Sequence, residues 1–130
     1  MTITELVEKS HANAVDKGFY ENPKETGTLL MLIVSELAEC LEADRHKNHT
    51  NGSYAEEWNK WYDDNPKGYD KADMISCFES GIKDTVEDEL ADAIIRIADM
   101  AGYMGIDLEA HVIAKMRYNS TREYLHGKRY

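Results

Sequence analysis

Two acidic motifs constrain the fold of this chain most strongly: Glu36-Leu-Ala-Glu39 and Glu89-Leu-Ala-Asp92. Each lies in an apolar segment with the period of a helix. Each also places two carboxylates three residues apart. Because residues i and i+3 lie side by side on a helix, each motif forms an edge of two carboxylates. If the two helices pack together, four carboxylates meet, and a divalent cation between them relieves their repulsion.

A single Glu-x-x-Glu pair is common on exposed helix faces and is weak evidence of function. Three features favour a functional interpretation here. The pattern occurs twice, both copies lie in hydrophobic stretches, and each contains a small residue, Ala38 or Ala91, that permits close helix approach. The repetition predicts that the two helices lie against each other.

Composition narrows the class of protein. A chain of 130 residues predicts one domain. Its net charge of −10 argues against a protein that grips duplex nucleic acid through phosphates. We expect no membrane span, because no apolar run is long enough, and no secretion signal at the N-terminus. Cys40 and Cys77 lack a metal-type spacing, so we expect a reduced, cytoplasmic protein.

Hydrophobic periodicity predicts an all-α fold. Four helices are expected to form a four-helix bundle-like core, over residues 4–19, 25–47, 85–103 and 107–124. Gly18 is expected to end the first helix, Gly102 and Gly105 the third. Thr85 with Asp88 resembles a capping box, and Asp107 is an expected N-cap. The buried stripes of the second and third helices are expected at Leu30, Ile33, Val34, Leu37, Leu41, Leu90, Ile94, Ile97, Ala98 and Ala101.

An insertion of about residues 48–83 separates the second and third of these helices within a single domain of residues 1–130. Turn signals at Asn65-Pro66 and Lys67-Gly68 divide it into two short expected helices, over 54–62 and 70–78. The insertion carries five aromatic residues that either stack on a base or anchor it to the core or to another subunit: Tyr54, Trp58, Trp61, Tyr62 and Tyr69. Anchoring is the simpler interpretation for any one of them.

The donor types favour Mg²⁺, with Mn²⁺ as the alternative, because the expected ligands are all carboxylates. Iron–manganese carboxylate bundles use Glu-x-x-His, which neither motif contains, and zinc favours His or Cys. Glu42 continues the acidic face of its helix and forms a weak candidate ligand pair with His46. Asp99 lies two turns beyond Asp92. Mg²⁺ on carboxylates suits hydrolysis of a phosphoanhydride, with one of the acids, or Glu42, as general base.

The C-terminal segment is basic. From Lys115 to Tyr130 it holds Lys115, Arg117, Arg122, Lys128 and Arg129 against a single acid, Glu123. Such a segment suits a small phosphorylated ligand held between a metal and cations, and a solvated tail is the alternative.

Three segments together resemble a known family: Ser35-Glu-Leu-Ala-Glu39-Cys-Leu-Glu-Ala, Glu87-Asp-Glu-Leu-Ala-Asp92 and Lys115-Met-Arg-Tyr-Asn119-Ser-Thr-Arg122. They resemble the all-α nucleoside triphosphate pyrophosphohydrolases of the MazG-like superfamily. That group includes dimeric dUTPases, dCTP pyrophosphatases and phosphoribosyl-ATP pyrophosphohydrolase. The resemblance covers roughly residues 26–45 and 85–128. The gap between the acidic motifs is longer here than is usual in the family.

The resemblance implies cleavage of a nucleoside triphosphate between the α and β phosphates, giving a monophosphate and pyrophosphate. The substrate is expected to be a dNTP or a non-standard nucleotide, and the protein a homodimer or homotetramer. The metal ligands and catalytic residues implied are Glu36, Glu39, Glu89 and Asp92. Lys115, Asn119 and Arg122 match the positions that contact phosphate or sugar.

Two other functions remain open at this point. One is a non-catalytic helical module that binds nucleotides or a protein partner, with its acids solvated. The other is a carboxylate-bridged redox-metal protein, against which the absence of Glu-x-x-His counts strongly. Only the hydrolase hypothesis predicts that Glu39→Gln or Asp92→Asn abolishes turnover while the fold survives.

Overall fold

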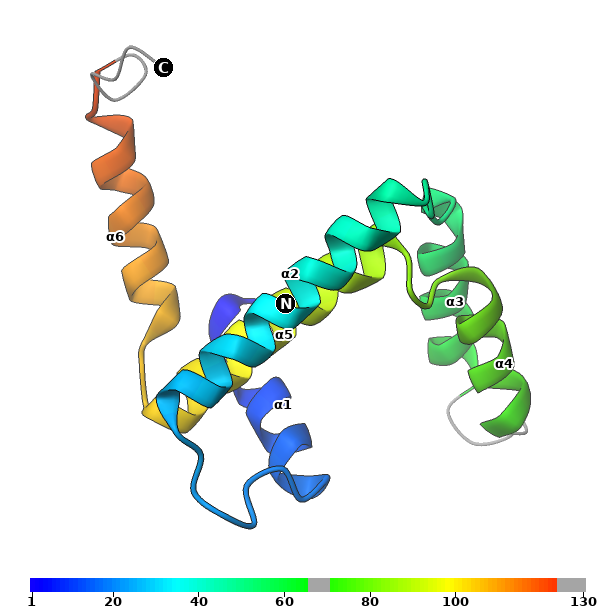
Figure 1. Cartoon of the computed structure of the whole chain (residues 1–130), viewed down its shortest axis with the longest axis horizontal. Coiled ribbons are helices and arrows are strands. Elements are labelled where there is room, and N and C mark those ends of the chain that lie inside the picture. Colours follow the sequence, from blue (N-terminus) through cyan, green and yellow to red (C-terminus); the bar gives the residue numbers. More distant parts are fainter. Residues whose placement is uncertain (66–70, 124–130) are drawn as a thin grey trace. The chain divides into compact units, whose positions relative to one another are not determined.

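The computed structural model describes residues 1–65 and 71–123, and within these ranges the chain is all helical, with no strand. The described helices are α1 (Ile3–Asp16), α2 (Thr26–Arg45), α3 (Gly52–Asp64), α4 (Lys71–Gly81), α5 (Val86–Met104) and α6 (Leu108–Ser120) (Figure 1). The predicted all-α class and the two helices of the insertion are confirmed. The expectations for Tyr69, Lys128 and Arg129 fall outside the described residues.

The chain divides into two compact units. One comprises Met1–Lys24 and Ile95–Tyr130, and the other comprises Glu25–Ile94. Helix α5 contributes its second half to the first unit and its first half to the second. The single domain of residues 1–130 stays a prediction. No helix in the described part of the chain is long and apolar enough to cross a membrane.

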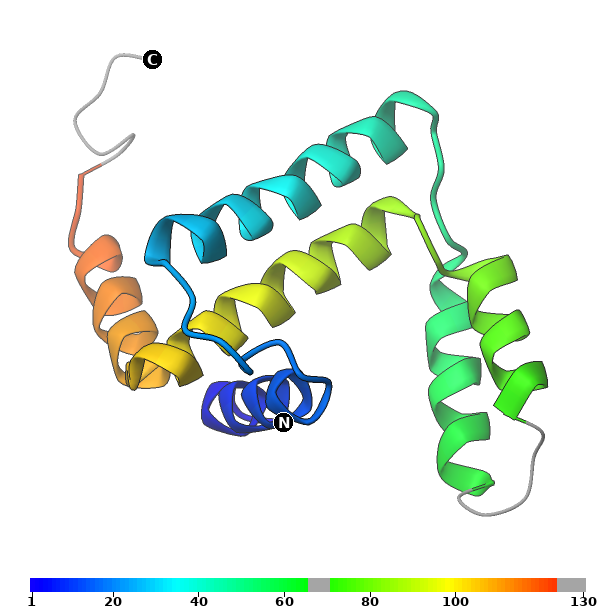
Figure 2. The ribbon, with the colours of Figure 1, turned by 60° about the horizontal axis from the view of Figure 1, so that its bottom comes forward.

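In the Glu25–Ile94 unit, α2 and the first half of α5 lie side by side in both views (Figures 1 and 2). The Thr85 hydroxyl caps α5 by accepting a hydrogen bond from the backbone N–H of Asp88, at 3.3 Å. The Asp88 carboxylate does not return to Thr85 as a capping box requires. It accepts instead from the backbone N–H of Asp84, at 3.0 Å, so the cap spans one residue more than expected.

The expected apolar stripes of α2 and α5 are largely not buried within the chain, which corrects the sequence-based prediction. Seven of the ten residues are between 42% and 54% exposed: Leu30, Val34, Leu37, Leu41, Leu90, Ile94 and Ile97. The buried apolar residues are mostly small: Leu29, Ala43, Ile82, Ala93, Ala98 and Ala101. The acidic edges of Glu36 and Glu89 take the buried positions, and this turns the neighbouring leucines outward.

Helices α3 and α4 of the insertion form a hairpin, which both ribbon views show clearly (Figure 2). Trp58 holds the hairpin together. Its ring contacts Phe78 of α4 edge to face at a centroid distance of 5.4 Å, and its Nε1–H donates to the Met74 carbonyl at 3.4 Å. Tyr62, one turn along α3, stacks on Trp58 at 5.4 Å. The aromatic residues of the insertion therefore pack on each other.

In the other unit, Asp99 is part of a polar cluster with His11 and Tyr20. Its carboxylate accepts from the Tyr20 hydroxyl at 2.8 Å and lies 2.9 Å from His11 Nδ1. Tyr103 stacks on Tyr20 at 4.7 Å. Burial and the hydrogen bond to Asp99 raise the pKa of Tyr20. Asp99 therefore joins α5 to His11 of α1 and to Tyr20 in the segment that follows α1.

The expected helix ends are partly corrected by α5. It continues to Met104, and Gly105 follows with a φ of 66°, as a helix-ending glycine does. Gly102 lies inside the helix. A Cβ placed on it would come within 2.6 Å of the His11 Cβ, so glycine at this position lets α1 approach α5 closely. Gly18, with a φ of 80°, follows the end of α1 as predicted.

We expect Gly102→Ala to lower the free energy of unfolding by about 1–3 kcal/mol, because the added methyl group overpacks the contact with His11. Urea unfolding followed by circular dichroism measures the effect. Gly27→Ala in α2 is the matched control, because a Cβ there meets no atom within 4 Å. A Gly102→Ala protein as stable as the Gly27→Ala protein would contradict the close approach.

Candidate functional site

Three of the four motif carboxylates converge. Glu36 of α2 meets Glu89 and Asp92 of α5, and one carboxylate oxygen from each lies within 4.8 Å of the others. Glu36 is 6% exposed and Glu89 5% exposed, while Asp92 is exposed. Glu39 lies outside this set but close to Glu89. Three of the four acids expected to meet therefore lie together, and the fourth, Glu39, lies next to them.

Neighbouring negative charges repel one another at Glu89 in this cluster. Burial raises the pKa of Glu89, and the charges of Glu39, Asp88, Glu36 and Asp92 raise it further. Burial also raises the pKa of Asp88, which the hydrogen bond from the Asp84 N–H partly opposes. Two buried acids, Glu36 and Glu89, therefore offer carboxylate oxygens within 4.8 Å of a third, so every potential ligand atom of the cluster is an oxygen. That donor set fits a hard divalent cation.

A polar cavity of about 520 Å³ adjoins the cluster. Its lining residues come from α2, from the turn after it and from the approach to α5: Glu39, Glu42, Ala43, His46, Lys47, Asn48, Asp84 and Glu89. Glu42 is held by Arg45 at 3.2 Å and by His46 at 3.0 Å, and these hydrogen bonds lower its pKa. His46 is thereby tied to Glu42 at the C-terminus of α2.

Two turns with unusual backbone conformations bound this cavity. Lys47 has a φ of 56° and Asp84 a φ of 60°, although neither is glycine. A left-handed conformation at such residues costs on the order of 1–3 kcal/mol each, so the surrounding contacts must hold it. The Asn48 side chain supplies one, donating to the Asp84 carbonyl at 2.7 Å. The Val86 N–H returns a hydrogen bond to the Asn48 carbonyl at 3.0 Å.

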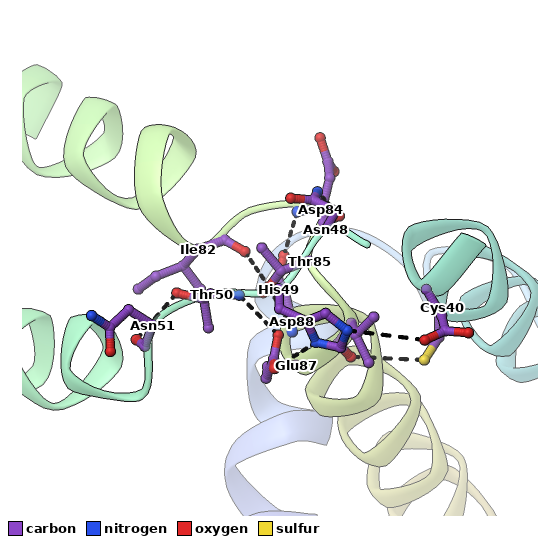
Figure 3. Close-up of polar contacts among 12 residues, drawn as sticks. Cys40, Asn48, His49, Thr50, Asn51, Ile82, Asp84, Thr85, Glu87 and Asp88 are labelled. Carbon is purple, nitrogen blue, oxygen red and sulfur yellow. Dashed lines mark hydrogen bonds and ion pairs between the residues drawn. The ribbon is translucent and has the colours of Figure 1, made fainter. Parts of the chain in front are cut away.

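The same turns are joined by a larger polar network at the root of the insertion (Figure 3). Glu87 accepts from the Thr50 N–H at 3.0 Å and contacts His49 Nδ1 at 3.0 Å, and these hydrogen bonds lower its pKa. The Thr50 hydroxyl donates to the Gly81 carbonyl at 2.7 Å. Cys40 lies 3.7 Å from the Val86 carbonyl through its sulfur. The network fixes where the insertion leaves α2 and enters α5.

A second cavity, of about 390 Å³, has an aromatic and apolar side and a charged side with three acids and one lysine. Trp58, Met74, Ile75 and Phe78 of the insertion form the first. Glu79, Lys83, Asp88 and Asp92 form the second. Asp92 therefore belongs both to the carboxylate cluster and to the wall of this cavity.

The three predicted phosphate- or sugar-binding residues lie in the other unit. Lys115 and Asn119 are exposed on α6, and Arg122 lies beyond the end of that helix at Ser120. The helix expected over residues 107–124 therefore ends earlier than predicted. Tyr118 connects the two cations, with Lys115 Nζ 4.9 Å from its ring and the Arg122 guanidinium carbon 5.9 Å from it.

Sequence reasoning missed Lys47, Asn48 and Asp84 as residues that shape the site. Their positions just after α2 and just before α5 could have suggested a role beside the motifs. Their backbone conformations and the contact between the two turns depend on how α2 and α5 are paired. No local pattern encodes that pairing.

We expect the metal-free protein to lose stability as pH rises above about 4.5, the ordinary pKa of a glutamate. Because the folded-state pKa of Glu89 is raised, the folded state binds more protons than the unfolded state between the two values, so stability falls through that window. Urea unfolding in EDTA between about pH 4 and pH 8 measures the slope. Glu89→Gln is expected to flatten it, whereas Asp44→Asn on exposed α2 surface is not. If the free energy of unfolding changed equally with pH in the unmodified, Glu89→Gln and Asp44→Asn proteins, the repulsion at Glu89 would be contradicted.

No family model, curated protein or solved structure matches this chain.

Proposed function

We propose that this protein is a nucleoside triphosphate pyrophosphohydrolase that depends on Mg²⁺, with Mn²⁺ as a possible substitute. The observation that carries the proposal is the convergence of Glu36, Glu89 and Asp92 from two helices, beside a polar cavity that also contains Lys47. The type of reaction is inferred from the resemblance of the sequence motifs to the MazG-like pyrophosphohydrolases. Cleavage then occurs between the α and β phosphates of a dNTP or a non-standard nucleotide.

The donor set supports the metal. Glu36, Glu89 and Asp92 would hold it, and the cation would supply positive charge to the phosphate oxygens as the bond breaks. The thiols and imidazoles nearby have other partners: Cys40 meets the Val86 carbonyl, and His46 meets Glu42. Oxygen donors alone favour Mg²⁺ or Mn²⁺ over zinc.

In this proposal Glu39 acts as the general base. It lies outside the three-carboxylate set but lines the polar cavity next to Glu89. In the proposed reaction Glu39 takes a proton from a water as the water oxygen bonds to the α-phosphorus. The bond from that phosphorus to the α–β bridging oxygen breaks, and pyrophosphate leaves. Lys47, in the same cavity, offsets negative charge on the phosphates.

Lys115, Asn119 and Arg122 are assigned to phosphate or sugar by motif resemblance. The cation–π contacts to Tyr118 support a common role for Lys115 and Arg122, because one ring holds both cations near each other. Arg122 can hold a phosphate through two parallel hydrogen bonds, whereas Lys115 acts as a point charge.

In this proposal the protein is a homodimer or a dimer of dimers, so each chain packs against a second copy. The exposed apolar residues of α2 follow a helix seam of i, i+4, i+7 and i+11, at Leu30, Val34, Leu37 and Leu41. On α5, Leu90, Ile94 and Ile97 follow the same spacing. Packing these seams across a two-fold axis would form the bundle-like core. The free thiols of Cys40 and Cys77 accord with the reduced, cytoplasmic location that belongs to the proposal.

The test is pyrophosphate release from a panel of NTPs and dNTPs, measured with Mg²⁺ and with EDTA. We expect pyrophosphate and the matching nucleoside monophosphate in equal amounts, with Mg²⁺ only. Orthophosphate as the sole product would overturn α–β cleavage while retaining a metal-dependent hydrolase. No release from any nucleotide, together with no rise in melting temperature on adding Mg²⁺, would favour the non-catalytic binding module.

A further inference from the structure

We infer that the α3–α4 insertion forms the nucleobase site of this protein, with the base held in the cavity walled by Trp58 and Phe78. The inference rests on the proposed function, because it assumes a nucleotide whose phosphates lie at the carboxylates. Its chemical content is specific. The proposed ligand group is a flat heteroaromatic ring that lies against the aromatic wall of this cavity. Inorganic triphosphate, which has no ring, would leave the cavity empty.

Size and lining support a ring. The cavity of about 390 Å³ lies within the range of about 300–1,000 Å³ typical of small-molecule sites. Trp58 and Phe78 meet edge to face, so two aromatic side chains border one space together with Met74 and Ile75. Every nucleobase has a π face, and stacking on such side chains is a recurrent mode of base recognition.

Position supports a nucleotide over other aromatic ligands. Asp92, a member of the carboxylate cluster, is also part of the wall of this cavity. A ligand with its ring against Trp58 therefore extends its other end toward the proposed metal ligands. The polar cavity with Lys47 contains two further acids of the motifs, Glu39 and Glu89. One cavity thus has an aromatic and apolar wall facing a charged one, the other is polar, and both include motif carboxylates, as a base joined to phosphates requires.

The aromatic wall is also held in place. The network at the root of the hairpin joins Thr50 to Glu87 and to Gly81, at the two ends of the insertion. The Nε1–H of Trp58 is bonded to the Met74 carbonyl, which orients the indole. A preorganised wall loses little freedom when it binds a ring, which is a general condition for a specific site.

Fluorescence tests the inference without any need for turnover. The chain has two tryptophans, so Trp61→Phe leaves Trp58 as the only indole emitter. We expect a nucleoside monophosphate to change Trp58 emission in a saturable way, with Mg²⁺ present. Ribose 5-phosphate, which has the same phosphate and no base, should cause less than a tenth of that change. In the reciprocal Trp58→Phe protein, Trp61 emission should not respond, because Trp61 does not line the proposed base cavity and lies on a neighbouring one that Trp58 shares. Equal responses to both ligands, or a response from Trp61 alone, would overturn the inference.

Kinetics separates this inference from the proposed function. We expect Trp58→Leu to lower kcat/KM for the preferred nucleoside triphosphate by about ten- to a hundredfold, the usual range for loss of one stacking partner. Hydrolysis of inorganic tripolyphosphate should be unchanged, and Trp58→Tyr should retain most of the nucleotide activity. If Trp58→Leu lowers both activities equally, the base site is wrong and the hydrolase stands. Base-dependent fluorescence without any hydrolysis would leave the base site standing and refute the hydrolase.

Discussion

Replacing Asp92 by asparagine is expected to lower kcat by about a thousandfold, the usual cost of removing a group that stabilises developing charge. The substitution preserves volume and removes one of three converging carboxylates. Because Asp92 is exposed, the fold should survive, and far-ultraviolet circular dichroism should match that of the unmodified protein. The same variant should lose the Mg²⁺-induced rise in melting temperature, since a cation that binds only the folded state stabilises it.

Glu39→Gln is expected to distinguish the proposed general base from the proposed metal ligands. Because Glu39 lies outside the three-carboxylate set, this variant should lose turnover yet keep the Mg²⁺-induced rise in melting temperature. Asp44→Asn, on exposed surface of the same helix, is the control and should keep both properties. Loss of the Mg²⁺ response in Glu39→Gln would make Glu39 a fourth ligand. Full activity in both Asp92→Asn and Glu39→Gln would refute the metal assignment.

Val34→Asp is expected to raise the dissociation constant of the dimer by at least about a hundredfold, because it buries an unpaired carboxylate in the proposed apolar seam. Val34 is 49% exposed within one chain, so the substitution should not disturb the fold of that chain. Valine and aspartate also have similar helix propensities. Sedimentation velocity over a concentration series measures the change.

Val34→Ile is the matched control for that experiment, since it adds one methylene and keeps the seam apolar. It should remain a dimer at concentrations where Val34→Asp is a monomer. A protein without substitutions that stays monomeric at every concentration would refute the second copy. The apolar seams of α2 and α5 would then be left for a different protein partner, as in the binding-module alternative.

The carboxylate pairs show how much of the candidate site the local sequence pattern predicts. Glu36 and Glu39, like Glu89 and Asp92, are three residues apart, and helix geometry alone places each pair on one edge. Which members meet across two helices depends on the offset between α2 and α5. The structure brings Glu36 to Glu89 and Asp92 and leaves Glu39 beside them. Periodicity predicts a helix and its faces, but an offset of one turn leaves that periodicity unchanged.

The apolar stripes show where local pattern misled. Leu37 and Leu90 have the spacing of core residues, and burial is the ordinary expectation for such a stripe. In this chain the acidic edges and small alanines take the positions between α2 and the first half of α5, leaving Leu37 and Leu90 about half exposed. A stripe that is buried only by a second copy has the same sequence pattern as one buried within the chain. Composition gives no means to tell them apart.

Local sequence patterns were enough to predict the helices, because periodicity, caps and ending glycines involve residues only a few positions apart. They also predicted that two carboxylate edges exist, since helical geometry follows from spacing. Helix packing, which no local pattern predicts, sets which faces are buried, pairs Asp99 with His11 and Tyr20, and brings Gly102 against His11. It also places Trp58 and Asp92 on one cavity. These are contacts between residues far apart along the chain, and they depend on how whole helices pack.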